Sequence, residues 1–250
     1  MTVVEVADGV LVTTSAIDTT TSTVVVRDGA ALLVDPAWLP SELVALADLL
    51  DDRGLTVAAG FSTHAHHDHL LWHPRFGAVP RWASRRTAEL AVSERPALLD
   101  HMGPGWPSEI LALFAQVEAV DGERLPEPWS EVELLRHDGH APGHTALWLP
   151  ERGVLLAGDM LSDVELPLPF WPDDLPAYRA GLDTLAPFVA RAAALVPGHG
   201  HPTTDPMARL DADRRYLDDA ITRGDSDDPR IANPDMAENH AHLLRLVRAG

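Results

Sequence analysis

The stretch THAHHDHL at residues 63–70 places four histidines and one aspartate directly after an apolar run, VAAGF. Such a run, short and bounded by polar residues, predicts a buried strand. Residues two apart in an extended chain point to the same side, so His64 and His66 can approach one metal ion together. If the chain then turns into a helix, Asp68 and His69 are directed to a second point nearby. Imidazole and carboxylate together suit zinc, iron or manganese.

Three more short motifs carry the same residue types, each next to a predicted strand. His144 lies in PGHT before a strand, Asp159 follows a strand in GD, and His199 follows a strand in PGHG. Strand ends are rigid places from which loops present functional side chains. Each motif alone is a weak signal, but the ordered set HxHxDH, PGHT, GD and PGHG is specific.

Apolar periodicity predicts an α/β chain in which helices cover sheets. Strands are expected over residues 3–6, 10–14, 23–27, 31–34, 57–62, 132–136, 145–149, 154–156 and 193–196. Helices are expected from an N-cap at Ser41 to a stop at Gly54, over 88–99, 110–117 and 178–189, and onwards from Pro206 and Pro234. Residues 84–128, with glycine and proline near both ends, are expected to form a helical insertion that serves as a lid or substrate wall.

The composition of the chain narrows the range of partners that we expect it to bind. The chain has 250 residues and a formal net charge of −19, and it is expected to form one domain over 1–250. The charge disfavours nucleic acid and anionic membranes, so the expected partner is a small-molecule substrate; a homodimer is left open. The absence of cysteine excludes disulfides and thiolate metal sites. No signal peptide or apolar run of about 18 residues is recognised, so a cytoplasmic protein is expected.

With these motifs in this order, the chain resembles the metallo-β-lactamase-fold superfamily. The resemblance implies a four-layered αββα sandwich with a two-metal site along one edge. By position, the matching ligands of the first metal are His64, His66 and His144, and those of the second are Asp68, His69 and His199. Asp159 matches the carboxylate that bridges both metals, and Asp35, in LLVDPA, matches an aspartate that orients the site.

Within the superfamily, the chain is similar to the glyoxalase II, lactonase and thioesterase branches. True β-lactamases generally lack an aspartate bridge, and some place cysteine or serine near that point, whereas this chain has Asp159 and no cysteine. Glyoxalase II itself is disfavoured because no obvious basic cluster is present for the carboxylates of glutathione. The arginines near the histidine motif that could alter this view are Arg75, Arg81, Arg85 and Arg86.

The expected activity is hydrolysis with two divalent metal ions, zinc first and iron or manganese as alternatives. A hydroxide held between the metals is expected to attack the carbonyl of a small ester, lactone or thioester. Asp68 is expected to orient that hydroxide and move its proton, and Asp159 to set the metal separation. The alternatives are an iron-dependent dioxygenase or other redox enzyme, a β-lactamase, and a non-catalytic binding module.

Other residues are weaker candidates for the site. His67 is expected to point away from the metals, and His140 to contact substrate rather than metal. Trp72 and His73 are expected on the same short helix as the histidine motif. Phe170 and Trp171 are candidates for either pocket or core. The remaining aromatic residues are divided between the insertion, with Trp106, and the core, with Trp38, while His240 and His242 are expected to be structural.

Overall fold

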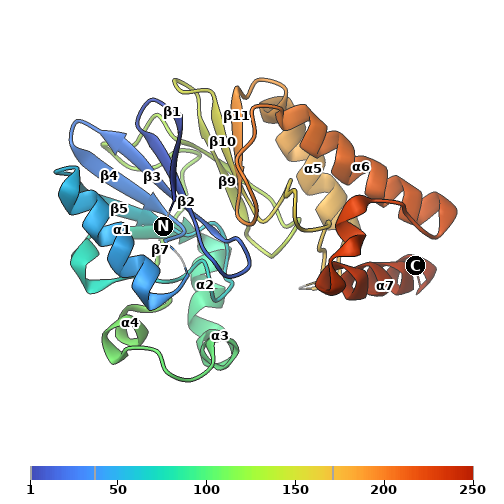
Figure 1. Cartoon of the computed structure of the whole chain (residues 1–250), viewed down its shortest axis with the longest axis horizontal. Helices are drawn as coiled ribbons and strands as arrows, with labels where there is room; N and C mark the ends of the chain where they lie inside the picture. Colours follow the sequence, from blue (N-terminus) through green and yellow to red (C-terminus); the bar gives the residue numbers. More distant parts are fainter. Residues whose placement is uncertain (1, 37, 171, 250) are drawn as a thin grey trace.

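The computed structural model describes residues 2–36, 38–170 and 172–249 (Figure 1). One sheet has seven strands in the order β1-β2-β3-β4-β5-β6-β7, and the other has four in the order β11-β10-β9-β8. The strands are β1 Val3–Ala7, β2 Val10–Thr14, β3 Thr21–Arg27, β4 Ala30–Val34, β5 Thr56–Phe61, β6 Arg81–Ser84, β7 Glu118–Val120, β8 Glu133–Arg136, β9 Thr145–Leu149, β10 Val154–Gly158 and β11 Ala194–Pro197. The helices are α1 Pro40–Asp52, α2 Arg85–Ser93, α3 Arg95–Met102, α4 Ser108–Leu113, α5 Leu175–Val189, α6 Pro206–Arg223 and α7 Pro234–Ala249, with 3₁₀ turns η1 Pro74–Phe76 and η2 Pro229–Ala232.

Three hydrophobic cores lie between four layers. Leu46 of α1 and Phe114, just after α4, belong to a core on the outer side of the seven-stranded sheet. Phe61 and Leu147 belong to a second core, which the two sheets enclose between them. Leu182 of α5 belongs to a third, under the helices that cover the four-stranded sheet (Figure 1). The predicted αββα sandwich is therefore confirmed.

Parallel strand pairs explain where the helices lie. β4 and β5 are parallel, and so are β10 and β11. A parallel pair needs a crossover connection, which α1 and α5 supply on opposite outer faces. The first of these helices begins one residue before the predicted N-cap. Its cap is Leu39 and not Ser41, and Pro40 occupies the first turn, where a missing N–H costs no hydrogen bond.

Polar chain segments from both sheets meet along one edge of the sandwich. These segments are residues 62–69 after β5, residues 137–144 before β9, Asp159 after β10 and His199 after β11. Two backbone hydrogen bonds tie the sheets together here. Thr145 N–H donates to Thr63 O at 2.9 Å, and Thr21 N–H donates to Gly198 O at 2.7 Å. The fold thus brings four motifs that are far apart in sequence to one place.

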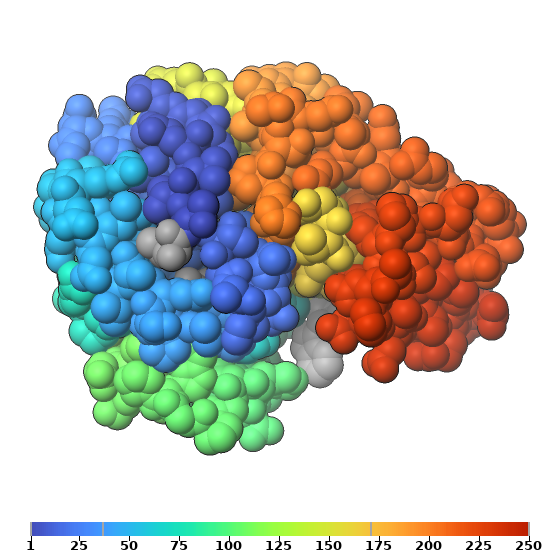
Figure 2. All heavy atoms as spheres, in the orientation of Figure 1, coloured from blue at the N-terminus to red at the C-terminus, as the bar shows by residue number. Residues whose placement is uncertain are grey.

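The segment 84–128 is partly built into the seven-stranded sheet. The segment contains β7, and β6 lies at its start. Both are short parallel strands that the apolar periodicity did not predict. The helix predicted over 88–99 is two helices, α2 and α3, which meet at Glu94, because Pro96 lacks the N–H that a continuous helix needs there. The helix predicted over 110–117 ends at Leu113. The α3–α4 stretch forms a lobe separated by a notch from the C-terminal helices (Figure 2).

A buried guanidinium joins the C-terminal segment to the loop that follows Asp159. Arg230, in η2, donates to the carbonyl oxygens of Ser162 and Glu165 at 3.0 and 2.8 Å. It also lies 2.7 Å from Asp213 Oδ1, and the side chains of this pair are 7 % and 1 % exposed. Because a charge buried this deeply needs a partner, we expect the pair to be important for stability. None of the helices in the described part of the chain combines the length and the apolar composition that a membrane span requires.

Replacing Arg230 tests this arrangement. Arg230→Met should lower the free energy of unfolding by about 3–5 kcal/mol, because it leaves Asp213 buried without its partner. Chemical denaturation measures the change. The control is Arg214→Met, which breaks a pair with Asp183 whose side chains are 41 % and 75 % exposed. That change should cost at most about 1 kcal/mol. Equal losses in the two variants would contradict the expectation.

Candidate metal centre

The histidine motif forms a turn rather than a helix. After β5 the chain bends through residues 62–69, and His69 N–H donates to His66 O at 3.2 Å. The expectation of a helix at this point is therefore wrong. The turn still separates the side chains into two groups. The first contains His64, His66, His140 and Asp159, and the second contains Asp68, His69 and His199.

The first group is formed by the turn, the loop before β9 and the end of β10. Asp159 Oδ2 lies 3.2 Å from His64 Nε2 and 3.4 Å from His140 Nε2. His140 Nε2 also lies 3.2 Å from His66 Nδ1. His64 is fully buried, and His140 and Asp159 are each 7 % exposed. Three imidazoles and one carboxylate therefore converge on one point.

His140 occupies the place in this group that was predicted for His144. Residues 137–144 form a loop whose base is closed by a hydrogen bond from His137 N–H to His144 O, 2.9 Å. His144 lies at that base, where its Nε2 accepts a hydrogen bond from Asp159 N–H at 3.1 Å. His140 lies nearer the tip and reaches the other histidines. The structure thus brings His140, and not the predicted His144, into the first group, because His144 lies at the loop base next to β9.

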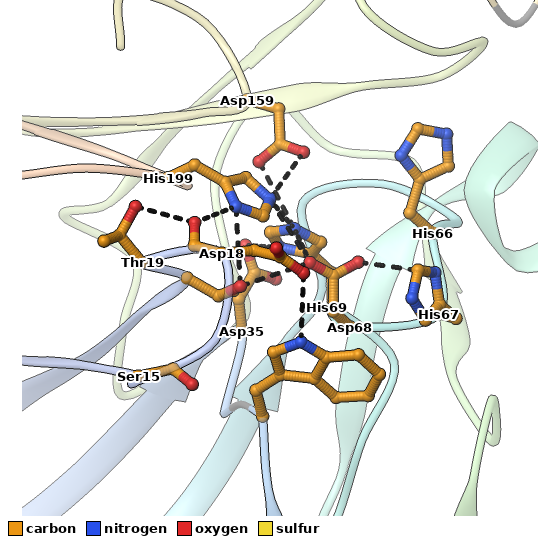
Figure 3. Close-up of polar contacts among 12 residues, drawn as sticks. Ser15, Asp18, Thr19, Asp35, His66, His67, Asp68, His69, Asp159 and His199 are labelled. Atoms are coloured by element: carbon orange, nitrogen blue, oxygen red, sulfur yellow. Dashed lines mark hydrogen bonds and ion pairs between the residues drawn. The ribbon is translucent and has the colours of Figure 1, made fainter. Parts of the chain in front are cut away.

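The second group surrounds Asp68, as Figure 3 shows. Asp68 Oδ2 lies 3.4 Å from His69 Nε2 and 3.2 Å from His199 Nε2. Asp159 faces this group as well, with Oδ1 3.3 Å from His69 Nε2 and Oδ2 3.3 Å from His199 Nε2. The carboxylate of Asp159 therefore lies between the two groups.

Residues behind the second group fix the histidine rings. Asp35 Oδ2 lies 3.0 Å from His69 Nδ1, and the same carboxylate accepts hydrogen bonds from Thr63 N–H and Oγ1 at 2.8 and 2.6 Å. His199 Nδ1 lies 2.8 Å from Asp18 O, in the β2–β3 turn (Figure 3). Because Asp18 O can only accept, His199 donates to it through Nδ1, which directs His199 Nε2 towards the group.

Burial and neighbouring charges shift the pKa values of the histidines and aspartates in the two groups in opposite directions. Burial lowers the pKa of His140 to about 3 and holds that of His66 well below its usual range. Burial would raise the pKa of Asp68, but the neighbouring His69 and His199 hold it well below the usual range. Burial would likewise lower the pKa of His69, but Asp159 and the other nearby carboxylates raise it well above the usual range. The carboxylates are thus ionised and the second group is strongly polar.

The donor set fits divalent metal ions. Among the described residues, His64 Nε2 and Asp159 Oδ1 are buried without a hydrogen-bond partner, and both face the other members of the groups. Buried polar atoms are normally paired, so an unpaired imidazole nitrogen and carboxylate oxygen at one point fit a site that binds a cation. Imidazole and carboxylate ligands without thiolate suit zinc, iron or manganese.

Several weaker candidates lie outside the two groups. Trp72 is 2 % exposed and its Nε1 donates to Gly77 O, and His73 caps η1 through Arg75 N–H, so neither faces the groups. Phe170 packs edge-on against His242 of α7, with ring centroids 4.5 Å apart. Trp171 lies outside the described residues.

The α3–α4 lobe touches the histidine motif through aromatic rings. Trp106 stacks on Trp38 with ring centroids 5.3 Å apart, and Trp38 meets His67 edge-on at 5.0 Å. His101 lies 6.0 Å from the same His67 ring. His67, which Figure 3 shows on the other side of Asp68 from the shared carboxylate, therefore belongs to an aromatic wall beside the second group.

Residues that the sequence analysis missed come mostly from the β2–β3 turn and the loop after β10. Thr20 Oγ1 donates to Asp68 Oδ2 at 3.3 Å, and Glu165 Oε1 lies 3.8 Å from His199 Nδ1. Burial raises the pKa of Glu165 to about 7. Neither residue has a motif of its own, because contacts across 179 positions, such as Thr20 with His199, leave no local signal. For His140 the signal was present as a second glycine–histidine pair, GHAPGH.

Comparison with known protein families shows to which superfamily the chain belongs. Residues 17–216 match the model of the metallo-beta-lactamase superfamily. The chain belongs to the metallo-beta-lactamase superfamily. The match spans the turn at Asp18, both groups and the shared Asp159, and it ends within α6.

Curated relatives of this superfamily member are named hydroxyacylglutathione hydrolase. The one from a Synechococcus species is 33 % identical over 142 residues, which is 54 % of this chain and 47 % of the relative. The one from Thermosynechococcus vestitus is 33 % identical over 138 residues, covering 54 % of this chain and 45 % of the relative. The chain thus spans about half the length of the curated relatives that it matches.

Solved structures of the superfamily share the fold at low identity. A metallo-beta-lactamase family protein from Thermus thermophilus is 23 % identical with a TM-score of 0.68, over 98 % of this chain and 95 % of that one. A beta-lactamase domain protein from Burkholderia ambifaria is 19 % identical with a TM-score of 0.67, over 99 % and 85 %. The metallo-beta-lactamase DIM-1 is 19 % identical with a TM-score of 0.62, over 85 % and 94 %.

The close approach of Gly198, directly after β11, to Asp159 provides a steric test. A Cβ atom at Gly198 would clash with Asp159 Oδ1 and lie 2.9 Å from the carbonyl carbon of Gly158. Gly198→Ala should therefore displace the shared carboxylate and weaken metal binding at least about 10-fold, as measured by chelator competition.

The matched control is Gly122→Ala, in a loop where the nearest atom to the new Cβ is 3.3 Å away. Circular dichroism should show that both variants keep the fold. Unchanged metal affinity in Gly198→Ala would contradict the arrangement described for Asp159.

Proposed function

We propose that the chain is a dinuclear metal-dependent hydrolase of a small ester, lactone or thioester, with zinc as the first choice of metal. The observation that carries this proposal is the position of Asp159. Its two oxygens lie within 3.4 Å of four imidazole nitrogens, those of His64, His140, His69 and His199, which belong to two different groups. A carboxylate in that position suits two ions that share a bridge.

We assign some side chains of the two groups to metal binding and one to proton transfer. His64, His66 and His140 are proposed to hold one ion, and His69 and His199 the other, with Asp159 shared. Divalent ions in such a site supply a water of lowered pKa and stabilise the negative charge that develops on a carbonyl oxygen. Asp68 is proposed to orient that water and to move its proton, since Thr20 Oγ1 and the two histidines hold its Oδ2.

The surroundings of the groups favour a substrate without several negative charges. The four arginines near the motif are all engaged in the fold: Arg75 with Asp48 and Asp51, Arg81 with Leu113 O and Leu70 O, Arg85 with Asp121, and Arg86 with Glu89. Trp106, Trp38 and His67 offer an aromatic wall instead. We infer that the acyl part of the substrate is neutral and apolar. Thioesters stay among the proposed substrates because the curated relatives carry the name of a thioester hydrolase.

Replacing the shared carboxylate tests the proposed activity. Asp159→Asn should lower hydrolysis at least about 100-fold, because the amide cannot bridge two cations as a carboxylate does. Rates on a panel of lactones, esters, thioesters and β-lactams measure the effect and identify the substrate class. Glu151→Gln is the matched control, since this exposed residue lies in the β9–β10 turn, away from both groups.

Metal analysis of protein purified without added metal accompanies the panel. Two zinc ions per chain would support the proposal, whereas a single iron with oxygen-dependent turnover would favour the dioxygenase alternative. Full hydrolysis by metal-free protein would refute the proposal outright.

A further inference from the structure

His144 lies against the metal centre without being a member of either group. It is fully buried, and its ring is stacked with those of His64 and His137, at centroid distances of 5.1 and 4.6 Å and with 28° between the planes in both pairs. Its Nδ1 faces His137 Nε2 at 3.2 Å. The ring is therefore packed against two other imidazoles, one of which also lies close to its Nδ1.

The second nitrogen of His144 holds the main chain of Asp159. An amide N–H can only donate, so the 3.1 Å contact between Asp159 N and His144 Nε2 is a hydrogen bond that the imidazole accepts. The lone pair that could bind a cation is occupied in this way. Because the accepted bond is made at the backbone of Asp159, the ring constrains where the carboxylate begins.

The neighbouring glycine shows how closely the ring approaches the chain. Gly158 has a φ of +56°, and a Cβ atom there would clash with His144 Nε2. The carbonyl oxygen of Gly158 accepts hydrogen bonds from Gly198 N–H at 2.6 Å and Met160 N–H at 2.8 Å. The turn that carries Asp159 is thus held by Gly198, directly after β11, through Gly158 O and by His144 through the Asp159 amide.

The backbone of His144 is anchored to the same framework. The adjacent Thr145 N–H donates to Thr63 O at 2.9 Å, immediately before His64. His144 therefore connects the strand end that presents His64 with the turn that presents Asp159. These two residues belong to one group, and their side chains must keep a fixed separation to share a cation.

We propose that His144 is a positioning residue for the metal centre: it accepts a hydrogen bond from the Asp159 amide and so fixes the carboxylate that the two groups share. This inference rests on the proposed function only in assuming that the groups bind a divalent cation. It also gives the buried PGHT histidine a role that differs from the ligand role its motif suggested.

Two amide variants separate an acceptor role from mere space filling. In His144→Gln, the side-chain oxygen reaches about as far as Nε2 and can accept from Asp159 N–H. In His144→Asn, the same chemical group stops near the position of Nδ1 and cannot reach. We expect Asn to weaken binding of Co²⁺ about 10- to 100-fold and to alter its visible spectrum, and Gln to restore both towards wild type.

Equilibrium titrations with Co²⁺ and a competing chelator measure affinity without reference to catalysis. Wild-type affinity in His144→Asn, or equal losses in the Gln and Asn variants, would overturn the proposal. If the Asn variant does not fold by circular dichroism, the Gln variant decides alone: a folded Gln variant with a tenfold or greater loss overturns it, and near wild-type affinity supports it.

His140→Gln distinguishes this proposal from the proposed function. It removes a member of the first group, so it should abolish one Co²⁺ equivalent whatever His144 does. If wild type binds no Co²⁺, the proposed function fails. If wild type and His140→Gln behave as expected but both His144 variants match wild type, only the inference about His144 fails.

Discussion

The arrangement of the metal centre and of the loops around it depends on two buried carboxylates. Asp68 and Asp159 are 5 % and 7 % exposed, and each would be costly to ionise in such surroundings without compensation. The compensation comes from imidazoles that three separate chain segments bring to one edge. The negative charge of these carboxylates is thus compensated only where loops from both sheets lie together. At that edge, bound cations would replace protons as the balancing positive charge.

The scaffold meets this demand by tying the loops to each other. Thr63 links β5 to β9 through its carbonyl oxygen and holds Asp35 through its amide and hydroxyl groups. Ser162 Oγ donates to His199 O at 2.7 Å, and Arg230 holds the carbonyl oxygen of Ser162. Residue 230 lies beyond the segment that matches the family model, so part of this support comes from outside that segment.

The sequence was informative where a local pattern decides the structure. Continuous apolar runs predicted β9 and β10 at nearly their observed bounds, because such strands are covered on both faces. The split between α2 and α3 and the strands β6 and β7 were missed, since three- and four-residue strands have too little periodicity to detect. The motifs placed Asp159, His64 and His199 at one edge, but the choice between His140 and His144 depends on how one loop closes, and sequence spacing does not report that.

The contact between His199 and Asp18 joins residues 181 positions apart, and it closes the second group. We expect such a contact to form late in folding, because closing so long a loop is opposed by chain entropy until the surrounding packing is in place. The metal centre is therefore complete only when both sheets of the native structure are in place. By thermodynamic linkage, an ion that binds only the folded centre stabilises the folded chain by an amount that rises with the ion's concentration relative to its dissociation constant. Affinity for metal and resistance to global unfolding are therefore linked equilibria in this chain.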